Sequence, residues 1–351
     1  MTKIRLALVF KDFAAWIRSS CVGLHVAGYA TAEVLREHGI EVVVFPVRHN
    51  VDLVNAINKY NDEHEDPLTH VIISAPWLSA YDARSLIEEF QDTQFVILSH
   101  SNVGFLQADP WGVELLRAYQ ELGEWHDNLR VGGNSERFVN WLREAYGADD
   151  VVLLPNLYPM AGCGHAKRWE GDTLKIGGFG AIRPYKNLMT AAGAAVVLQR
   201  MYNVPVEFHM SAGGDGQMEV PAIRQIFAGV DNLTLVLHPW CYWNDFIEIV
   251  SEMDILLSPS YTESFNMITA DGIACGVPSV VSPAITWAPE AWKADPDDAV
   301  GIAHVAKRLL DHRILANQGI EALAQHNKKA LRCWLDYLRG HKSWLERLLG
   351  Q

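Results

Sequence analysis

Cysteine is scarce in this sequence, and no long apolar run occurs. Five cysteines are scattered over 351 residues, and no two of them form a C-x-x-C pair. An odd number of dispersed thiols predicts neither a disulfide framework nor a zinc site, and it is typical of a reduced setting. No apolar stretch approaches the roughly 18 residues that a membrane span needs. The apolar part of the N-terminus is also too short for a signal peptide, so we expect a cytoplasmic protein.

Basic residues are in deficit. Lysine and arginine total 29 against 42 acidic residues, which gives a formal net charge of -13. A general nucleic-acid binder carries a basic face, so this balance argues against nucleic acid as a partner. The hydrophobic content of 49% with 20% charged residues is typical of a globular protein, and the length fits two domains.

Several catalytic and cofactor motifs are missing. Gly178 and Gly180 begin a G-x-G-x-x-G pattern, but Arg183 stands where the third glycine is needed. No P-loop and no G-x-S-x-G elbow occur, and the histidines lack metal-ligand spacing. NAD, ATP and a metal site are therefore not predicted. Asp295, Asp297 and Asp298 resemble a D-x-D metal motif, but they precede an amphipathic helix over 300–310, which favours helix capping.

What the sequence does contain is a repeated alternation of apolar strands and amphipathic helices, which predicts two doubly wound, mainly parallel sheets. We expect an N-terminal domain over 1–160, a linker over 161–171, a second domain over 172–330 and a C-terminal helix over 331–351 that packs back on the first domain. The expected strands cover residues 4–10, 41–46, 70–74, 94–100, 129–131, 174–178, 206–211, 233–237, 255–257 and 279–281.

The C-terminal segment 316–349 has a long helical pattern that breaks near Gly340. Its far end combines aromatic and basic residues. Packing of the aromatic face on the domains is the favoured interpretation. Peripheral contact with a membrane surface is the alternative, because basic amphipathic helices can lie in a lipid interface.

The most informative stretch follows the strand at 255–257. Glu263 comes shortly before a helix start and Asp271 lies eight positions later. A helix N-terminus offers unpaired N–H groups and a positive dipole end, which suit phosphate, and carboxylates suit hydroxyl groups. Arg183 and Lys186 follow a glycine-rich turn after the strand at 174–178, and two cations there would neutralise a diphosphate. Phosphate together with a polyol suggests a nucleotide sugar.

These two motifs, in this order, resemble the nucleotide-sugar site of the retaining GT-B glycosyltransferases of family 4. The resemblance covers about residues 172–310 well and the first domain only in outline. Glu263 matches the first acid of the family's Glu-x7-Glu motif, and Asp271 stands at the usual second glutamate. The resemblance implies a GT-B fold, with two Rossmann-like domains facing a central cleft. It also implies transfer with retention of configuration and without a metal or other cofactor.

The resemblance implies a role for each matching residue. Arg183 and Lys186 would bind the diphosphate, Glu263 would lie beside the donor sugar and Asp271 would hold the ribose. The glycine-rich turn would let the backbone approach the ligand. The glycine of this turn is Gly180. The backbone N–H groups that would cap the phosphate or sugar belong to Phe265, Asn266, Met267 and Ile268.

In the first domain, His100 ends a strand and would contact the donor sugar, whereas Gly23 resembles the family's glycine-rich first loop without its usual Gly-Gly pair. Loops near Trp77, 102–107 and Trp111 are candidates for acceptor selection. Loops at 211–216 and 238–243 would border the nucleobase.

We therefore predict a glycosyltransferase that uses a UDP- or GDP-sugar and an acceptor hydroxyl on a glycan, a lipid-linked molecule or a small molecule. Two alternatives stay open: a nucleotide-sugar epimerase or hydrolase on the same fold, and a non-catalytic nucleotide-sugar-binding protein. Transfer to a modified DNA base is disfavoured by the acidic balance.

Overall fold

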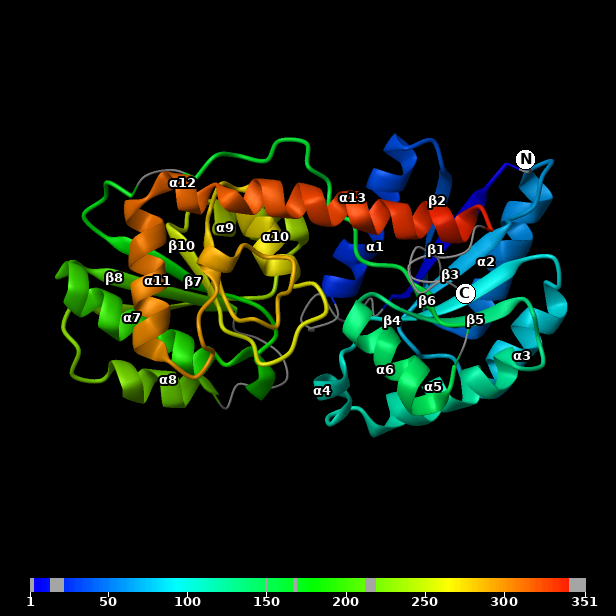
Figure 1. The fold of residues 1–351 in the computed structure, drawn as a ribbon, viewed down its shortest axis with the longest axis horizontal. Coiled ribbons are helices and arrows are strands. Elements are labelled where there is room, and N and C mark those ends of the chain that lie inside the picture. The colour runs from blue at the N-terminus through cyan, green and yellow to red at the C-terminus, as the bar shows by residue number, and fades with distance from the viewer. Residues whose placement is uncertain (1–2, 13–21, 149, 167–168, 212–218, 341–351) are drawn as a thin grey trace. The chain divides into compact units, whose positions relative to one another are not determined.

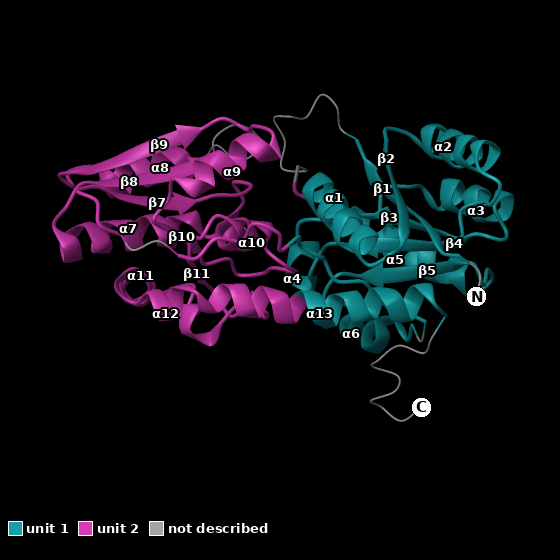
Figure 2. Cartoon of the chain, turned by 90° about the horizontal axis from the view of Figure 1, so that it is seen from above, with its two compact units in different colours: residues 1–13, 24–159, 327–351 teal, residues 14–23, 160–326 magenta. Residues whose placement is uncertain are grey.

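A computed structural model describes residues 3–12, 22–148, 150–166, 169–211 and 219–340. The chain divides into two compact units (Figure 2). Unit 1 joins the described parts of residues 1–13, 24–159 and 327–351, and unit 2 joins those of 14–23 and 160–326. Residues 212–216 of a loop predicted to border the nucleobase, and residues 341–351 of the predicted C-terminal helix, lie outside the described residues.

Unit 1 is an α/β layer structure around a six-stranded parallel sheet of order β2-β1-β3-β4-β5-β6 (Figure 1). Its elements are β1 (Arg5–Lys11), α1 (Val22–Glu37), β2 (Glu41–Val47), α2 (Asn50–Glu63), β3 (His70–Ser74), α3 (Ala80–Glu89), β4 (Gln94–Ser99), α4 (Val103–Leu106), α5 (Pro110–Gly123), β5 (Leu129–Gly133), α6 (Glu136–Tyr146) and β6 (Val152–Leu153).

Alternate residues of the unit 1 strands enter two separate cores. On β1, Ala7 and Val9 join the side chains of α2, α3, α5 and α6, whereas Leu6 and Leu8 join those of α1 and the end of α13 (Gln318–Leu338). Successive side chains of a strand point to opposite faces, so these two cores cover the two faces of the sheet. The sheet is therefore doubly wound, as the alternating pattern predicts.

The end of α13 is part of unit 1. Trp334 is 1% exposed within the core that contains α1, and its Nε1 donates a hydrogen bond to the carbonyl of Pro155 over 2.8 Å. Gly340 follows the helix with a φ of +65°, a conformation that favours glycine and ends helices. Helix α13 ends at Leu338, two residues before Gly340, and Trp334 in its last turns lies in a core of unit 1.

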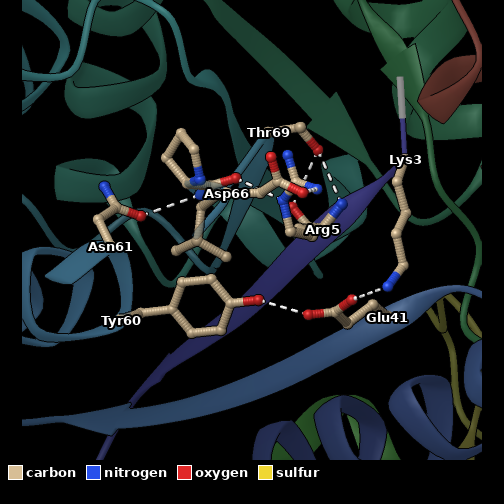
Figure 3. Close-up of polar contacts among 9 residues, drawn as sticks. Lys3, Arg5, Glu41, Tyr60, Asn61, Asp66 and Thr69 are labelled. Carbon is tan, nitrogen blue, oxygen red and sulfur yellow. Dashed lines mark hydrogen bonds and ion pairs between the residues drawn. The ribbon is translucent and has the colours of Figure 1, made fainter. Parts of the chain in front are cut away.

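A polar cluster ties the beginning of β1 to its neighbours (Figure 3). Arg5 is 6% exposed and pairs with Asp66 at 2.8 Å. Glu41 on β2 accepts from the Tyr60 hydroxyl at 2.7 Å and pairs with Lys3 at 2.9 Å. Burial, followed by the hydrogen bond to Glu41, raises the pKa of Tyr60 to about 12. These contacts satisfy polar groups at the amino ends of the strands, so they stabilise the sheet at the edge away from its carboxyl ends.

Unit 2 contains a five-stranded parallel sheet of order β11-β10-β7-β8-β9. Its elements before α13 are β7 (Leu174–Gly178), the 3-10 turn η1 (Pro184–Lys186), α7 (Leu188–Tyr202), β8 (Val206–Ser211), α8 (Glu219–Phe227), β9 (Leu233–His238), α9 (Trp243–Ser251), β10 (Ile255–Ser258), α10 (Met267–Ala274), β11 (Ser279–Val281), η2 (Glu290–Trp292), α11 (Ala299–Asp311) and α12 (Arg313–Ala316).

The expected strands are all present, with bounds that differ by one or two residues at most. The two-residue strand β6 was not expected, because its segment leads directly into a proline-containing loop. Among the described residues, no helix combines the length and the apolar character that crossing a membrane requires.

Candidate functional site

The strand order of unit 2 reverses between β7 and β10, which lie side by side in the sheet (Figure 1). The glycine-rich turn follows β7, and the segment with Glu263 follows β10. Ligands of open α/β sheets bind beyond the carboxyl ends of the strands at such a switch point. The two sequence motifs therefore leave the sheet at the place where ligand binding is expected.

Gly180 brings the turn close to the other motif. Its φ of +115° is a conformation that side chains with a Cβ rarely adopt, so glycine is required by the backbone. A Cβ built at Gly180 would lie 3.7 Å from Lys186 Cε and 4.0 Å from Ile268 Cγ1. The turn, the lysine and the first turn of α10 are thus in contact within unit 2.

Lys186 and Glu263 form an ion pair across these two motifs. Lys186 Nζ lies 2.5 Å from Glu263 Oε1, and the two side chains are 25% and 10% exposed. Charged groups in such a setting interact more strongly than they do on an open surface. A phosphate at this position would find a lysine that is already held in place by a carboxylate.

Asn266 holds the same carboxylate from the helix side. It is the N-cap of α10, with a φ of +70°, and its Oδ1 accepts from the backbone N–H of Thr269 at 2.9 Å. Its Nδ2 donates to Glu263 Oε1 at 3.0 Å. Asparagine tolerates this left-handed conformation better than most residues and is a favoured N-cap. One side chain therefore both starts the helix and orients Glu263.

Two further side chains brace these loops. Asn187 also has a positive φ, of 55°, and its Nδ2 donates to the carbonyl oxygens of Pro259 and Pro296 at 3.1 and 2.6 Å. The indole of Trp287 stacks on Phe265 and donates to its carbonyl oxygen at 2.6 Å. Since buried polar groups need partners, these bonds fix the paths of the loops that follow β7 and β10.

The other residues predicted for this site lie beside η1 and at the start of α10. Arg183 is the half-buried residue that immediately precedes η1. Phe265 is 2% exposed. Met267 and Ile268 are the first two residues of α10, where the N–H groups point out of the helix end. Ile268 and Lys186 both lie against Gly180, so the start of α10 is on the same side of the sheet edge as the lysine.

Asp271 occupies the middle of α10 and is only 2% exposed. Its Oδ1 accepts a hydrogen bond from Trp243 Nε1 at 3.0 Å. Trp243 is the first residue of α9, so it lies just beyond the loop that leaves the carboxyl end of β9. Asp271 is therefore held by a residue of α9, whereas Glu263 is held by Lys186 and Asn266.

His100 belongs to unit 1, where it directly follows β4. Its Nδ1 lies 3.2 Å from Asn134 Nδ2, which also donates to Asn156 Oδ1 at 3.3 Å. Burial lowers the pKa of His100 to about 4, so the ring is neutral at pH 7. A neutral imidazole ring can donate one hydrogen bond and accept another, and it carries no charge. Asn102, which begins the predicted acceptor loop, accepts from the Ser135 hydroxyl at 2.6 Å.

The remaining predictions for the first domain are spread over both units, and Gly23 belongs to unit 2. Gly23 lies in the first turn of α1 and is exposed. A Cβ built there has nothing within 4 Å, so the described structure gives no steric reason for glycine. Trp77 follows β3 and packs under Lys11, with Nζ 5.5 Å from the ring centroid. Trp111 is the second residue of α5 and is 61% exposed.

Of the first loop predicted to border a nucleobase only Ser211, the last residue of β8, is described, and the second loop begins at His238, the last residue of β9. His238 Nε2 lies 2.8 Å from His209 Nδ1, and His209 Nε2 lies 3.1 Å from Glu207 Oε2. Burial lowers the pKa of both histidines. A carboxylate partner favours the proton on His209 Nε2, which leaves Nδ1 to accept from His238.

Asp298 acts as a helix cap, as expected. Its Oδ1 accepts from the backbone N–H of Gly301 at 2.9 Å at the start of α11. Within the described residues, no three His, Cys, Asp or Glu side chains gather as a metal site would require.

The asparagine side chains that hold Glu263, His100 and the loops after β7 and β10 are not predicted from the sequence. The side-chain role of Asn266 has a local signal, because asparagine directly before a helix is a common N-cap. Asn187 also precedes a helix, but its two carbonyl partners are 72 and 109 positions away. Asn134 and Asn156 follow the ends of strands, and no sequence spacing relates them to His100.

Residues 173–312 match the family described as Glycosyl transferases group 1. This match covers most of unit 2, including Gly180, Lys186, Glu263 and Asp271. No curated protein has a significant match to the chain.

Several solved structures share the fold, all at low sequence identity. The trehalose-6-phosphate synthase OtsA has a TM-score of 0.64 at 12% identity, with 97% of this chain and 100% of that chain covered. Sucrose-phosphate synthase from Thermosynechococcus elongatus has a TM-score of 0.62 at 16% identity, with 95% and 99% covered. These similarities establish a GT-B fold.

The S. aureus TarM G117R mutant, solved with Fondaparinux, alpha-GlcNAc-glycerol and UDP, has a TM-score of 0.56 at 13% identity. The match covers 82% of this chain, which spans only 59% of that protein. The family match and the shared fold together support glycosyl transfer as the type of reaction.

Proposed function

Since residues 173–312 match the glycosyl transferases group 1 family, we propose that the protein transfers a sugar from a nucleotide-sugar donor to an acceptor hydroxyl. The observation that carries this proposal is the convergence of Gly180, Lys186 and Glu263 at the switch point between β7 and β10. A glycine-lined backbone, a cation and a carboxylate at one sheet edge suit a diphosphate joined to a sugar.

Charge develops on the diphosphate as the glycosidic bond breaks. Lys186 and Arg183, together with the N-terminus of α10, would stabilise that charge more in the transition state than in the ground state. Because these groups supply positive charge, the proposed reaction uses no metal ion. Glu263 would accept hydrogen bonds from the donor sugar, and Asp271 would hold the ribose.

The donor that we propose is a UDP- or GDP-sugar, and the transfer retains the anomeric configuration. His100 of unit 1 would contact the donor sugar as a neutral ring, since its pKa is lowered to about 4. The loops with Trp77, residues 102–107 and Trp111 would select an acceptor, which is a glycan, a lipid-linked molecule or a small molecule. The proposed location is the cytoplasm, and any contact with a membrane would be peripheral and made through the C-terminal helix.

A thermal-shift screen over UDP-, GDP-, ADP- and dTDP-sugars tests donor binding, because a ligand of the folded state raises its stability. We expect a shift with UDP- or GDP-sugars that is absent in Lys186→Ala. No shift with any of these compounds would contradict the proposal.

Incubation of the binding donor with candidate acceptors tests transfer. Release of the nucleoside diphosphate together with a glycosylated product is expected, and the anomeric coupling in the product spectrum reports retention or inversion. Conversion of the donor without an acceptor would favour an epimerase or a hydrolase. Binding without consumption would favour a non-catalytic protein.

A further inference from the structure

The contact between Trp243 and Asp271 extends the proposed function. Trp243 Nε1 donates a hydrogen bond to Asp271 Oδ1 over 3.0 Å. Trp243 is the first residue of α9, and Asp271 lies within α10. Asp271 is 2% exposed, whereas Trp243 is only half-buried. The bond therefore connects a buried carboxylate to a side chain at the start of α9.

A buried carboxylate needs hydrogen-bond donors, because the loss of its hydration is costly. The backbone of Asp271 is committed to the helix, since its carbonyl accepts from the N–H of Cys275 at 3.0 Å. Only the two side-chain torsions are left to set the direction of the carboxylate. The indole N–H is a donor only, and it belongs to a large ring with few rotatable bonds. It fixes Oδ1, and a planar carboxylate with one fixed oxygen has the other oxygen fixed as well.

The identity of the acid makes this fixation important. Aspartate is one methylene shorter than the glutamate that the resembled family carries at this position. A shorter side chain reaches less far and tolerates fewer orientations in which it can meet a ligand hydroxyl. A hydrogen bond to a charged acceptor depends steeply on distance and angle.

We propose that Trp243 is a positioning residue that aims Asp271 at the ribose hydroxyls of the donor nucleotide. This inference rests on the proposed function. It assigns to Trp243 the discrimination between ribose and deoxyribose in the nucleotide, while Lys186 and the start of α10 provide affinity for the phosphates.

Titration calorimetry with UDP and GDP, and with the 2′-deoxy and 3′-deoxy forms of each, tests the assignment. For the wild-type protein we expect at least one deoxy form to bind about tenfold or more weakly than the parent nucleotide, in line with loss of a bond to a charged group. In Trp243→Phe, the parent and deoxy forms should bind within about threefold of each other, with the affinity for the deoxy form unchanged.

Trp169→Phe is the matched control. Trp169 also donates its Nε1, to the Thr173 carbonyl at 3.1 Å, and it lies in unit 2 just before the amino end of β7. It should keep the wild-type discrimination. Trp243→His retains a ring N–H and should restore part of the discrimination, and it serves as the test if Trp243→Phe does not fold.

The outcomes separate this inference from the proposed function. Nucleotide binding without discrimination in the wild type, or discrimination that survives in Trp243→Phe, would overturn the inference and leave the proposed function intact. Equal losses for parent and deoxy forms in Trp243→Phe would show a merely structural role and overturn it too. If the wild type binds no nucleotide, both proposals are wrong.

Discussion

Lys186 and Glu263 are 77 positions apart in the sequence, and the lysine Nζ lies 2.5 Å from the glutamate Oε1. The lysine ends the turn after β7, and the glutamate lies in the segment after β10. Asn266 donates to the same glutamate oxygen, so the carboxylate is held from two sides. This arrangement orients the lysine cation before any ligand binds, and such pre-orientation is what the proposed electrostatic stabilisation of the diphosphate requires.

Replacement of the lysine is the most direct test of that role. Lys186→Ala should lower kcat by about two orders of magnitude or more, because a stabiliser of the developing charge is removed. Steady-state kinetics with the donor from the thermal-shift screen measure the effect. Lys175→Ala is the control, since Lys175 pairs with Glu252 at 3.1 Å near the opposite end of β7. Turnover near the wild-type value in Lys186→Ala would refute the assignment.

Asn266 allows stability and activity to be separated. Asn266→Ala should lower the free energy of unfolding by about 2 kcal/mol, because it loses the N-cap bond and places alanine at a positive φ. Asn266→Gly should cost only a few tenths of a kcal/mol, since glycine accepts this conformation and is a tolerable N-cap.

Both variants should lose turnover, because each removes the donor to Glu263. Urea unfolding and kinetics on the two proteins provide the measurement. Equal stability losses would show that the conformation at residue 266 is not strained for alanine. Unchanged turnover in both would show that Glu263 does not need this bond.

Two histidines of unit 1 should make stability sensitive to acid. Burial lowers the pKa of His70 and of His100 from 6.5 to about 4. The unfolded chain therefore binds more protons than the folded one between these values, and stability falls as pH decreases from about 6.5 towards 4. Each histidine should contribute a loss of about 2 kcal/mol between pH 7 and pH 5.

His70→Gln tests this contribution away from the proposed site. The variant should show a shallower decrease of the unfolding midpoint between pH 7 and pH 5 than the wild type. His304→Gln, at an exposed position of α11, serves as the control. Parallel pH profiles for wild type and His70→Gln would contradict the prediction.

Asp298 distinguishes capping from metal binding. Asp298→Ala should destabilise the protein by about 1 kcal/mol through loss of the bond to the Gly301 N–H, without a change in turnover. Turnover of the wild type should also persist in excess EDTA. A large loss of activity in the variant, or sensitivity to the chelator, would point to a metal role for this segment.

Local sequence patterns suffice to predict the succession of strands and helices along the chain and the positions of Gly180 and Glu263 after apolar strands. Such features depend on local periodicity, and β3, β7, β8 and β11 have the expected bounds. The glycine-rich turn and the acid pair could be predicted because parallel strands end at one edge, so segments that follow them meet there.

Which side chains touch one another depends on how the strands and helices are arranged in space. The pairing of Lys186 with Glu263 follows from the adjacency of β7 and β10, which no local pattern specifies. The Trp243–Asp271 bond depends on how α9 and α10 pack against each other. Local chain preferences act over a few residues, whereas these contacts join positions 28 to 77 apart. Their geometry is therefore set by strand order and helix packing.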